Sequence, residues 1–268
     1  MTSICPPGPS GRLRFTVLGA FSATVDGRPA RLGGRRPRSL LAALLLGEGA
    51  VVPEERLVAA VWEDCLPEKP RQAIHTHVAE LRKELEPGRQ AGERPAVLLR
   101  GPAGYALAVT VAAVDARRFT ALVLAAEDAA ATGDPGRAVE LADLALGLWH
   151  GPAYADLADS AFLVPEIGRL DELHLIARET LVSGRLALGQ HLLPLIESRA
   201  LTAEHPLRES AWALHALALY RSGRPAEALQ ALATARGLLR EQLGTDPGPE
   251  LARLTQRVLA HDPALLGR

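Results

Sequence analysis

The sequence of 268 residues predicts an α+β domain over residues 12–110, followed by an all-α domain over residues 111–268. The first part alternates short apolar runs with glycine and proline turns, which is typical of strands mixed with helices. After Val114 only amphipathic helical runs remain. We interpret residues 1–11, which are rich in proline, as a disordered tail.

The first domain begins with a hairpin. Apolar and polar residues alternate over 13–17, which indicates a strand, and residues 21–25 indicate a second strand. Asp26 and Gly27 form one of the strongest short signals for a tight hairpin turn. We therefore expect a return strand over 29–32.

Three helices and a second hairpin follow. Leucines recur at helical spacing over 37–46, and apolar residues do so over 54–62, after a proline that suits a helix start. A third apolar stripe runs through 71–86. Residues 97–100 and 105–107 predict a hairpin. This order of sheet, helices and hairpin is that of a winged helix-turn-helix, whose last helix enters the DNA major groove.

One pattern recurs in the all-α half: a helix end, a turn with glycine, and a new amphipathic helix. It occurs at Gly133, Gly184 and Gly223. The spacing is looser than that of a strict repeat, but the unit resembles a tetratricopeptide-type (TPR-like) helix pair. Such pairs stack and present a surface to partner proteins.

The charges are distributed unevenly between the two halves. Residues 1–110 hold 15 basic and 11 acidic side chains, whereas residues 111–268 hold 15 basic and 20 acidic ones. The overall charge of −1 hides this asymmetry. We therefore expect a polyanion to meet the first domain.

Several protein classes are disfavoured. No apolar run approaches the roughly 20 residues that span a bilayer, and a secretory signal is lacking, so we expect a cytoplasmic, nucleoid-associated protein without a membrane partner. Cys5 and Cys65 are too few for a zinc framework and too far apart to favour a disulfide. The glycine-rich stretch at 33–39 lacks the ending of a phosphate loop, and a nucleophile elbow is absent. We expect no catalysis, no cofactor and no metal.

Ten segments carry a resemblance, in chain order. They are 15–19, 40–46, 56–62, 78–85, 100–105, 114–119, 148–152, 204–209, 219–224 and 243–251. On these segments the chain resembles the Streptomyces antibiotic regulatory proteins (the SARP family), which join an OmpR-type winged helix to a bacterial transcriptional activation domain. The resemblance covers about residues 12–263.

The resemblance implies a sequence-specific transcriptional activator for a secondary-metabolite (antibiotic) gene cluster. Such a protein binds direct repeats in double-stranded promoter DNA near the −35 element, as a head-to-tail homodimer. It also implies recruitment of the RNA polymerase holoenzyme through the sigma factor and the C-terminal domain of the α subunit.

The third helix has one apolar face, which leaves the other face free for a groove about 12 Å wide. The free face and its flanks consist of Arg71, Gln72, His75, Thr76, His77, Ala79, Glu80, Arg82 and Lys83. The resemblance implies base readout by Gln72, His75, Thr76 and Glu80, and phosphate contact by His77 and Arg82. Glu80 has the alternative of a salt bridge within the helix. We expect Arg71, Arg82 and Lys83 to form a free basic edge.

Four more residues are DNA-binding candidates. Trp62 is either a core residue or a donor to the DNA backbone through its indole N–H, and Tyr105 either packs or contacts a phosphate. The resemblance implies that Arg100, on the wing, reaches toward the minor groove. Arg38 either adds a phosphate contact or belongs to a solvated loop.

The loop between the second and third helices occupies the place where OmpR-type activators touch polymerase. Its charged residues are Glu63, Asp64, Glu68 and Lys69. Two alternatives stay open: a scaffold whose winged helix binds protein, and a repressor.

Overall fold

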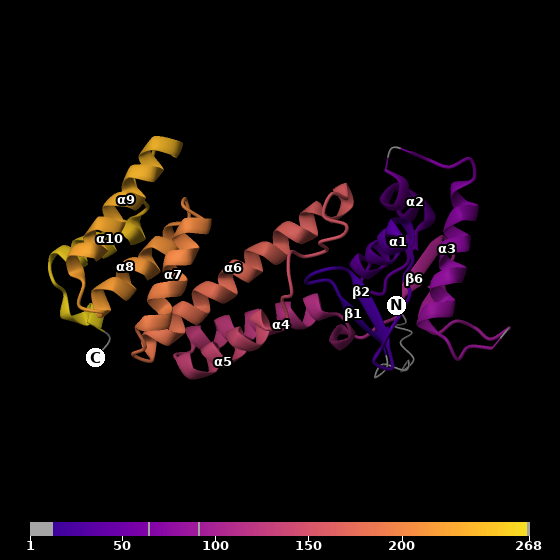
Figure 1. Cartoon of the computed structure of the whole chain (residues 1–268), viewed down its shortest axis with the longest axis horizontal. Helices are drawn as coiled ribbons and strands as arrows, with labels where there is room; N and C mark the ends of the chain where they lie inside the picture. Colours follow the sequence, from indigo (N-terminus) through magenta and orange to yellow (C-terminus); the bar gives the residue numbers. More distant parts are fainter. Residues whose placement is uncertain (1–12, 64, 91, 267–268) are drawn as a thin grey trace. The chain divides into compact units, whose positions relative to one another are not determined.

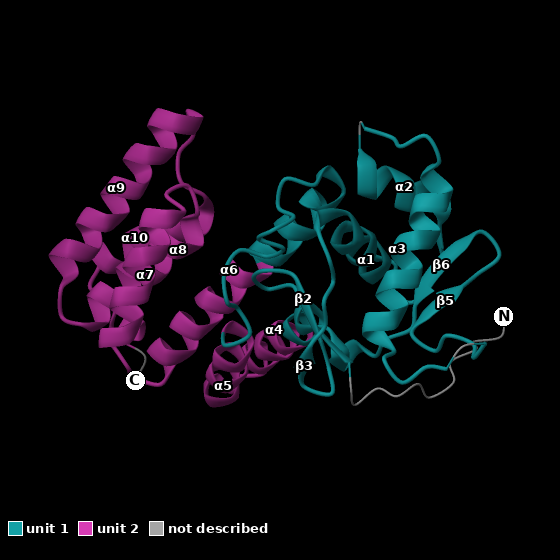
Figure 2. Cartoon of the chain, turned by 45° about the vertical axis from the view of Figure 1, so that its right-hand side comes forward, with its two compact units in different colours: residues 1–120, 147–172 teal, residues 121–146, 173–268 magenta. Residues whose placement is uncertain are grey.

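A computed structural model describes residues 13–63, 65–90 and 92–266 (Figure 1). The chain forms two compact units, one of residues 1–120 and 147–172 and the other of residues 121–146 and 173–268 (Figure 2). An α+β winged helix-turn-helix followed by helices is the fold class that the sequence predicts. The units do not coincide with the predicted domains, because residues 111–120 and 147–172 belong to the first unit. The tail expected over residues 1–11 lies outside the described residues.

The N-terminal sheet is a three-stranded meander. Its strands are β1 (Leu13–Thr16), β2 (Ser22–Val25) and β3 (Arg28–Pro29), in the order β1-β2-β3. Asp26 and Gly27 connect β2 and β3 with φ angles of 51° and 76°, which the primed hairpin turns require. The return strand covers Arg28–Pro29 and not the expected 29–32, although the N–H of Ala30 still donates a hydrogen bond to the Ala23 carbonyl at 2.9 Å.

The helix-turn-helix core follows. Its helices are α1 (Arg35–Leu46), α2 (Glu54–Trp62) and α3 (Pro70–Leu85), and its wing is the hairpin of β5 (Leu98–Arg100) and β6 (Gly104–Leu107). The short strand β4 (Val52–Pro53), absent from the sequence prediction, pairs with β6. Gly104 permits this pairing, because a Cβ there would lie 1.9 Å from the carbonyl oxygen of Val52.

Residues 147–163, here called the return segment, also pack on this unit. Three of their backbone N–H groups donate hydrogen bonds to the carbonyl oxygens of residues 17–19, at 2.8, 2.7 and 3.0 Å. Tyr154 is buried beside Phe21, with ring centroids 6.0 Å apart. Asp115 accepts hydrogen bonds from the backbone N–H groups of Val17 and Leu18. The N-terminal sheet is therefore completed by residues far away in sequence.

The helical part contains seven α-helices among the described residues. They are α4 (Asp115–Ala131), α5 (Pro135–Leu146), α6 (Val164–Ala187), α7 (Leu192–Glu204), α8 (Glu209–Arg221), α9 (Pro225–Leu243) and α10 (Pro249–Leu259). Short 3-10 turns lie at η1 (Val111–Ala113), η2 (Ala161–Leu163) and η3 (Pro263–Leu266). Where the structure describes the chain, no helix has the length and apolar character needed to cross a membrane.

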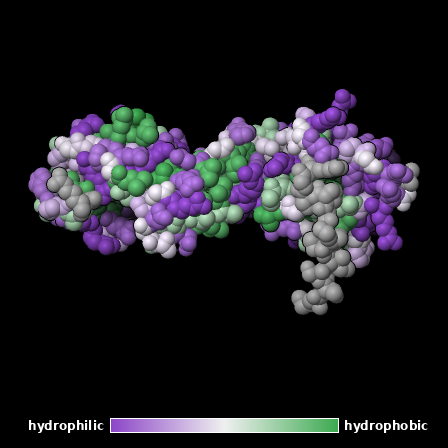
Figure 3. All heavy atoms as spheres, turned by 90° about the horizontal axis from the view of Figure 1, so that it is seen from below, coloured by the Kyte–Doolittle hydropathy of each residue, from purple (hydrophilic) through white to green (hydrophobic). Residues whose placement is uncertain are grey.

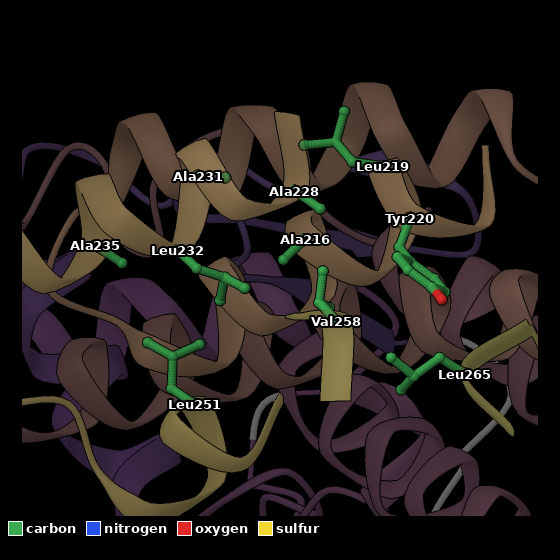
Figure 4. Packing of buried hydrophobic residues seen from close by; sticks show 10 residues of the cluster. All are labelled: Ala216, Leu219, Tyr220, Ala228, Ala231, Leu232, Ala235, Leu251, Val258 and Leu265. Carbon is green, nitrogen blue, oxygen red and sulfur yellow. The ribbon is translucent and has the colours of Figure 1, made fainter. Parts of the chain in front are cut away.

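Successive helices of the second unit pack in pairs. Helix α8 packs against both α7 and α9. Figure 4 shows the buried cluster formed by α8, α9, α10 and η3, in which four of the ten residues are alanines. Small side chains let neighbouring helices approach closely, which is the packing expected of TPR-like pairs.

One of the three expected turns is wrong. Gly133 and Gly223 lie in turns, at φ 82° and 74°, but Gly184 lies inside α6. A Cβ at Gly184 would come within 2.8 Å of Val139 Cγ2 on α5, so this glycine allows two helices to pack closely. The turn itself falls at Gly189, with φ 74°.

Apolar residues also lie on the surface, where Figure 3 shows apolar patches among polar ones. Leu192, Leu193 and Ile196 belong to the first half of α7, and each is more than half exposed. Helix α7 therefore presents apolar side chains to solvent.

Candidate nucleic-acid interface

Helix α3 buries one face and exposes the other. It begins with Pro70, whose ring suits the first helical position. Its apolar stripe is buried and consists of Ile74, Val78, Leu81 and Leu85. The opposite face is exposed and includes Arg71, Gln72, His75, Thr76, Ala79, Glu80 and Lys83. The predicted orientation of this helix is therefore confirmed.

A charged cluster lies where α3 begins. The carboxylate of Glu54 lies 3.9 Å from Arg71 Nε, 3.2 Å from His75 Nε2 and 3.4 Å from Arg100 Nη2. Glu54 is mostly buried, whereas the side chains of Arg71, His75 and Arg100 are 70%, 45% and 57% exposed. Glu54 thus places one carboxylate within 4 Å of three exposed side chains of α3 and the wing.

The cluster borders a hollow of about 400 Å³ between α2, α3 and the wing. Its walls are Pro53, Glu54, Glu55, Arg71, Arg100, Pro102 and Ala103. Two exposed guanidinium groups thus flank a concave surface beside α3. The same hollow is lined by Glu54 and Glu55, and Arg71 Nη2 lies 3.6 Å from Glu55 Oε1, so a phosphate bound there would compete with carboxylates for the two arginines.

Tyr105 holds the wing arginine in place. Arg100 Nη1 donates a hydrogen bond to the Tyr105 hydroxyl at 2.8 Å, and the guanidinium lies 5.3 Å from the ring centroid. Tyr105 is only 2% exposed, and burial raises its pKa, so the hydroxyl stays protonated. Of the two roles left open for Tyr105, the structure supports packing. Arg100 lies at the turn end of the wing, where its Nη1 is 3.3 Å from Nε2 of His75 on α3.

The expectation that Arg82 belongs to a free basic edge is wrong. Its Nε and Nη2 donate hydrogen bonds to the carbonyl oxygen of Leu98, at 2.9 and 2.8 Å. Desolvation by burial lowers its pKa. Its guanidinium therefore joins α3 to strand β5, and Arg71 and Lys83 are the exposed cations of the edge.

Trp62 is a core residue, and its indole nitrogen is a buried donor. It is 5% exposed, and its ring stacks on His77 with centroids 6.2 Å apart. Its indole N–H has no acceptor among the described residues. His77 is half-buried, and its Nδ1 lies 3.4 Å from Glu80 Oε2. Of the two roles left open for Glu80, the structure shows a contact within the helix, with His77.

Arg38 also has a different environment from the expected one. It lies in the first turn of α1, where its guanidinium pairs with Asp156 and its Nε donates to the Gly33 carbonyl at 3.2 Å. Nearby, Arg35 pairs with Asp159 at 2.6 Å. The return segment supplies both acidic partners, so the expected phosphate contact of Arg38 is replaced by an internal ion pair.

The expected polymerase-contact loop lies between α2 and α3. Glu63, Glu68 and Lys69 are exposed, and Asp64 lies outside the described residues. Sequence reasoning missed Leu66, which is 62% exposed in this loop. A single exposed leucine is common on protein surfaces and does not by itself mark a binding site.

Two family models match adjoining parts of the chain. Residues 28–107 match "Transcriptional regulatory protein, C terminal", and residues 114–259 match "Bacterial transcriptional activator domain". The first match contains α3 and the wing. The second contains the return segment and helices α4 to α10.

Curated relatives are transcriptional regulators. The chain is 42% identical to the regulatory protein AfsR of Streptomyces coelicolor, over 96% of this chain and 25% of AfsR. It is 36% identical to EmbR of Mycobacterium tuberculosis, over 94% of this chain and 64% of EmbR. It is 33% identical to RedD of Streptomyces coelicolor, over 95% of this chain and 73% of RedD. The chain thus spans about a quarter of the length of AfsR.

A solved structure has the same fold. It is Mycobacterium tuberculosis EmbR in complex with a low-affinity phosphopeptide, with a TM-score of 0.88 and 36% identity. The match covers 94% of this chain and 66% of that one.

Proposed function

This chain belongs to the Streptomyces antibiotic regulatory protein family of transcriptional activators, and we propose that it binds direct repeats in promoter DNA and recruits RNA polymerase to them. The observation that carries the proposal is the exposed polar face of α3. Arg71 and Arg100 flank a hollow at one end of this face, and Lys83 lies near the other.

The proposed DNA contacts divide into two classes. Gln72, His75 and Thr76 project from the exposed face toward base edges, where amide and hydroxyl groups can read the major groove. Arg71, Lys83 and Arg100 neutralise phosphates and supply most of the affinity. Arg82 contributes by keeping the wing against α3.

The proposed activation step uses the loop between α2 and α3. Two copies bind head to tail on direct repeats near the −35 element, with the helical part supporting the pair. The loop with Leu66, Glu68 and Lys69 then contacts the sigma factor. The C-terminal domain of the polymerase α subunit helps to hold the holoenzyme at the promoter. By this proposal the protein acts in the cytoplasm, on nucleoid DNA of a secondary-metabolite gene cluster.

Footprinting followed by transcription in vitro tests this function. The purified chain is incubated with the promoters next to its own gene, and we expect protection of two direct repeats near the −35 element. Addition of holoenzyme should then raise transcript yield. Protection without an increase in transcript indicates a repressor, and absence of protection on every promoter contradicts the proposal.

A further inference from the structure

The return segment contacts the residue at which the loop between α2 and α3 begins. Glu63 Oε1 accepts a hydrogen bond from the backbone N–H of Ala161, at 3.1 Å and across 98 positions of the chain. Ala161 is the first residue of η2, and η2 leads directly into α6. The first N–H groups of a helix lack partners within it, and the positive end of its dipole favours a carboxylate. Glu63 therefore caps this helix start from a distance.

Ser160, which precedes η2, does not cap the start of this helix with its own side chain. Ser160 occupies the N-cap position of η2 without a side-chain capping bond in the described structure. Its hydroxyl instead accepts a hydrogen bond from Arg35 Nη2, at 3.0 Å. The carboxylate of Glu63 thus replaces the usual serine cap.

The backbone of Glu63 is itself in an unusual conformation. It ends α2 with φ 46° and ψ −101°, a left-handed region that residues with a side chain rarely adopt. A residue keeps such a conformation only where surrounding contacts enforce it. Its N–H bonds to the Ala59 carbonyl at 3.0 Å, and its side chain bonds to Ala161. Both ends of the residue are therefore held where the loop leaves the helix.

The other partner in this contact is anchored independently of Glu63. Asp156 pairs with Arg38 and accepts from the Phe21 N–H at 2.6 Å, and Asp159 pairs with Arg35. These contacts fix the return segment to α1 and to the N-terminal sheet. Ala161 thus presents its N–H to Glu63 from a segment that has anchors of its own.

We propose that Glu63 is a positioning residue for the polymerase-contact loop. By capping η2 it fixes the direction in which the chain leaves α2, so that Leu66, Glu68 and Lys69 face the polymerase. Glu63 lies within the first family match and Ala161 within the second, so a segment of the activation domain orients a loop of the DNA-binding domain. This inference rests on the proposed recruitment of polymerase.

The test removes the hydrogen bond from each side in the full chain. Glu63→Ala removes the acceptor, and Ala161→Pro removes the donor while it keeps Glu63 in place. Proline is well tolerated at a first helical position, and Ser160, at φ −76° and ψ 117°, already has the extended conformation that precedes proline. The double variant and Glu63→Gln, whose amide oxygen still accepts, complete the set.

The measurements are promoter affinity by fluorescence anisotropy and transcript yield with holoenzyme at saturating promoter occupancy. We expect all variants to bind DNA like the parent. Glu63→Ala and Ala161→Pro should each lower transcript yield about fivefold, the factor that corresponds to one hydrogen bond. The double variant should be no worse than either single one, because both break the same contact. Glu63→Gln should keep most of the activity.

Three outcomes would overturn the inference. Full activation by Ala161→Pro beside a defective Glu63→Ala would show that Glu63 touches polymerase itself. Full activation by both would show that the contact has no role. Equal loss of DNA binding and activation in both would assign the contact to folding. Leu66→Ala and Glu68→Ala test the proposed function separately: if both activate like the parent, the loop is not the polymerase surface at all.

Discussion

The guanidinium of Arg82 in α3 donates two hydrogen bonds to a single acceptor, the carbonyl oxygen of Leu98 in β5, at 2.9 and 2.8 Å. The guanidinium carbon Cζ of Arg82 also lies 5.9 Å from the centroid of the Tyr105 ring in β6. Helix α3 is thereby connected to both strands of the wing, which fixes the exposed face of α3 relative to Arg100.

Replacement of Arg82 should loosen the wing. Arg82→Ala leaves a half-buried carbonyl without its donor, which costs about 1–3 kcal/mol of the free energy of unfolding. Affinity should fall for every DNA sequence alike. Denaturant unfolding and anisotropy titrations on two unrelated duplexes measure both effects. Arg82→Lys is the matched control, and it should recover only part of the stability because lysine cannot form the two-armed contact. Parent-like stability of Arg82→Ala would contradict this account.

Removal of the Tyr105 hydroxyl should affect DNA binding more than folding. Tyr105→Phe keeps the buried ring but takes away the acceptor for Arg100 Nη1. We expect promoter affinity to fall by about 0.5–1.5 kcal/mol, since Arg100 loses the bond that orients it. The melting temperature should change little. A variant that binds promoter DNA as tightly as the parent would show that Arg100 needs no such support.

Thr76 should determine which site is preferred. Its side chain is exposed on α3, and its hydroxyl donates to the Gln72 carbonyl at 3.1 Å, so the hydroxyl oxygen can still accept a hydrogen bond from outside. Thr76→Ala should change the order of affinities within a set of single-base promoter variants, by about 1–3 kcal/mol at one position. Thr76→Ser keeps the hydroxyl and removes the methyl group, so it separates the contributions of these two groups to site preference. An unchanged order of affinities in Thr76→Ala would exclude base readout by this residue.

The helical unit should lose stability in mild acid through His215. Its Nδ1 lies 3.1 Å from Ser198 Oγ, and its pKa is lowered by burial and then by the nearby Arg199 and Arg224. The unfolded chain therefore takes up a proton more readily than the folded one. The corresponding stability is present above the ordinary pKa of 6.5 and is lost as the pH falls through the folded value.

This pH dependence is measured by denaturant unfolding of the parent and of His215→Gln, from about pH 7.5 to about pH 5. We expect the free energy of unfolding of the parent to fall relative to that of the variant over this interval. Parallel curves for the two proteins would show that His215 does not titrate differently in the folded state.

Features set by neighbouring residues could be predicted from the sequence. The exposed face of α3 follows from the spacing of Ile74, Val78, Leu81 and Leu85, and the hairpin turn follows from Asp26 and Gly27. In each case the pattern and the structure it specifies lie within one element. The order of the elements then indicated the winged helix.

Features that depend on distant residues could not be predicted. Arg38 looks like a free cation until Asp156, 118 positions away, is placed beside it. Gly184 looks like a turn residue because its partner Val139 belongs to another helix. Arg82 looks free on the helix because its acceptor, the Leu98 carbonyl, belongs to the wing, which the helix periodicity does not describe. The return segment itself carries no periodic signal, so its contact with Glu63 was not foreseen.

The salt dependence of promoter binding tests the central claim most directly. The logarithm of the association constant is measured against the logarithm of the salt concentration for the parent, for Arg71→Ala/Lys83→Ala, and for Arg253→Ala, an exposed arginine of α10. We expect a steep linear fall for the parent, a slope smaller by about 2 for the double variant, and a parent slope for Arg253→Ala. No duplex binding by the parent at low salt, or an unchanged slope in the double variant, would contradict the claim that α3 receives the DNA.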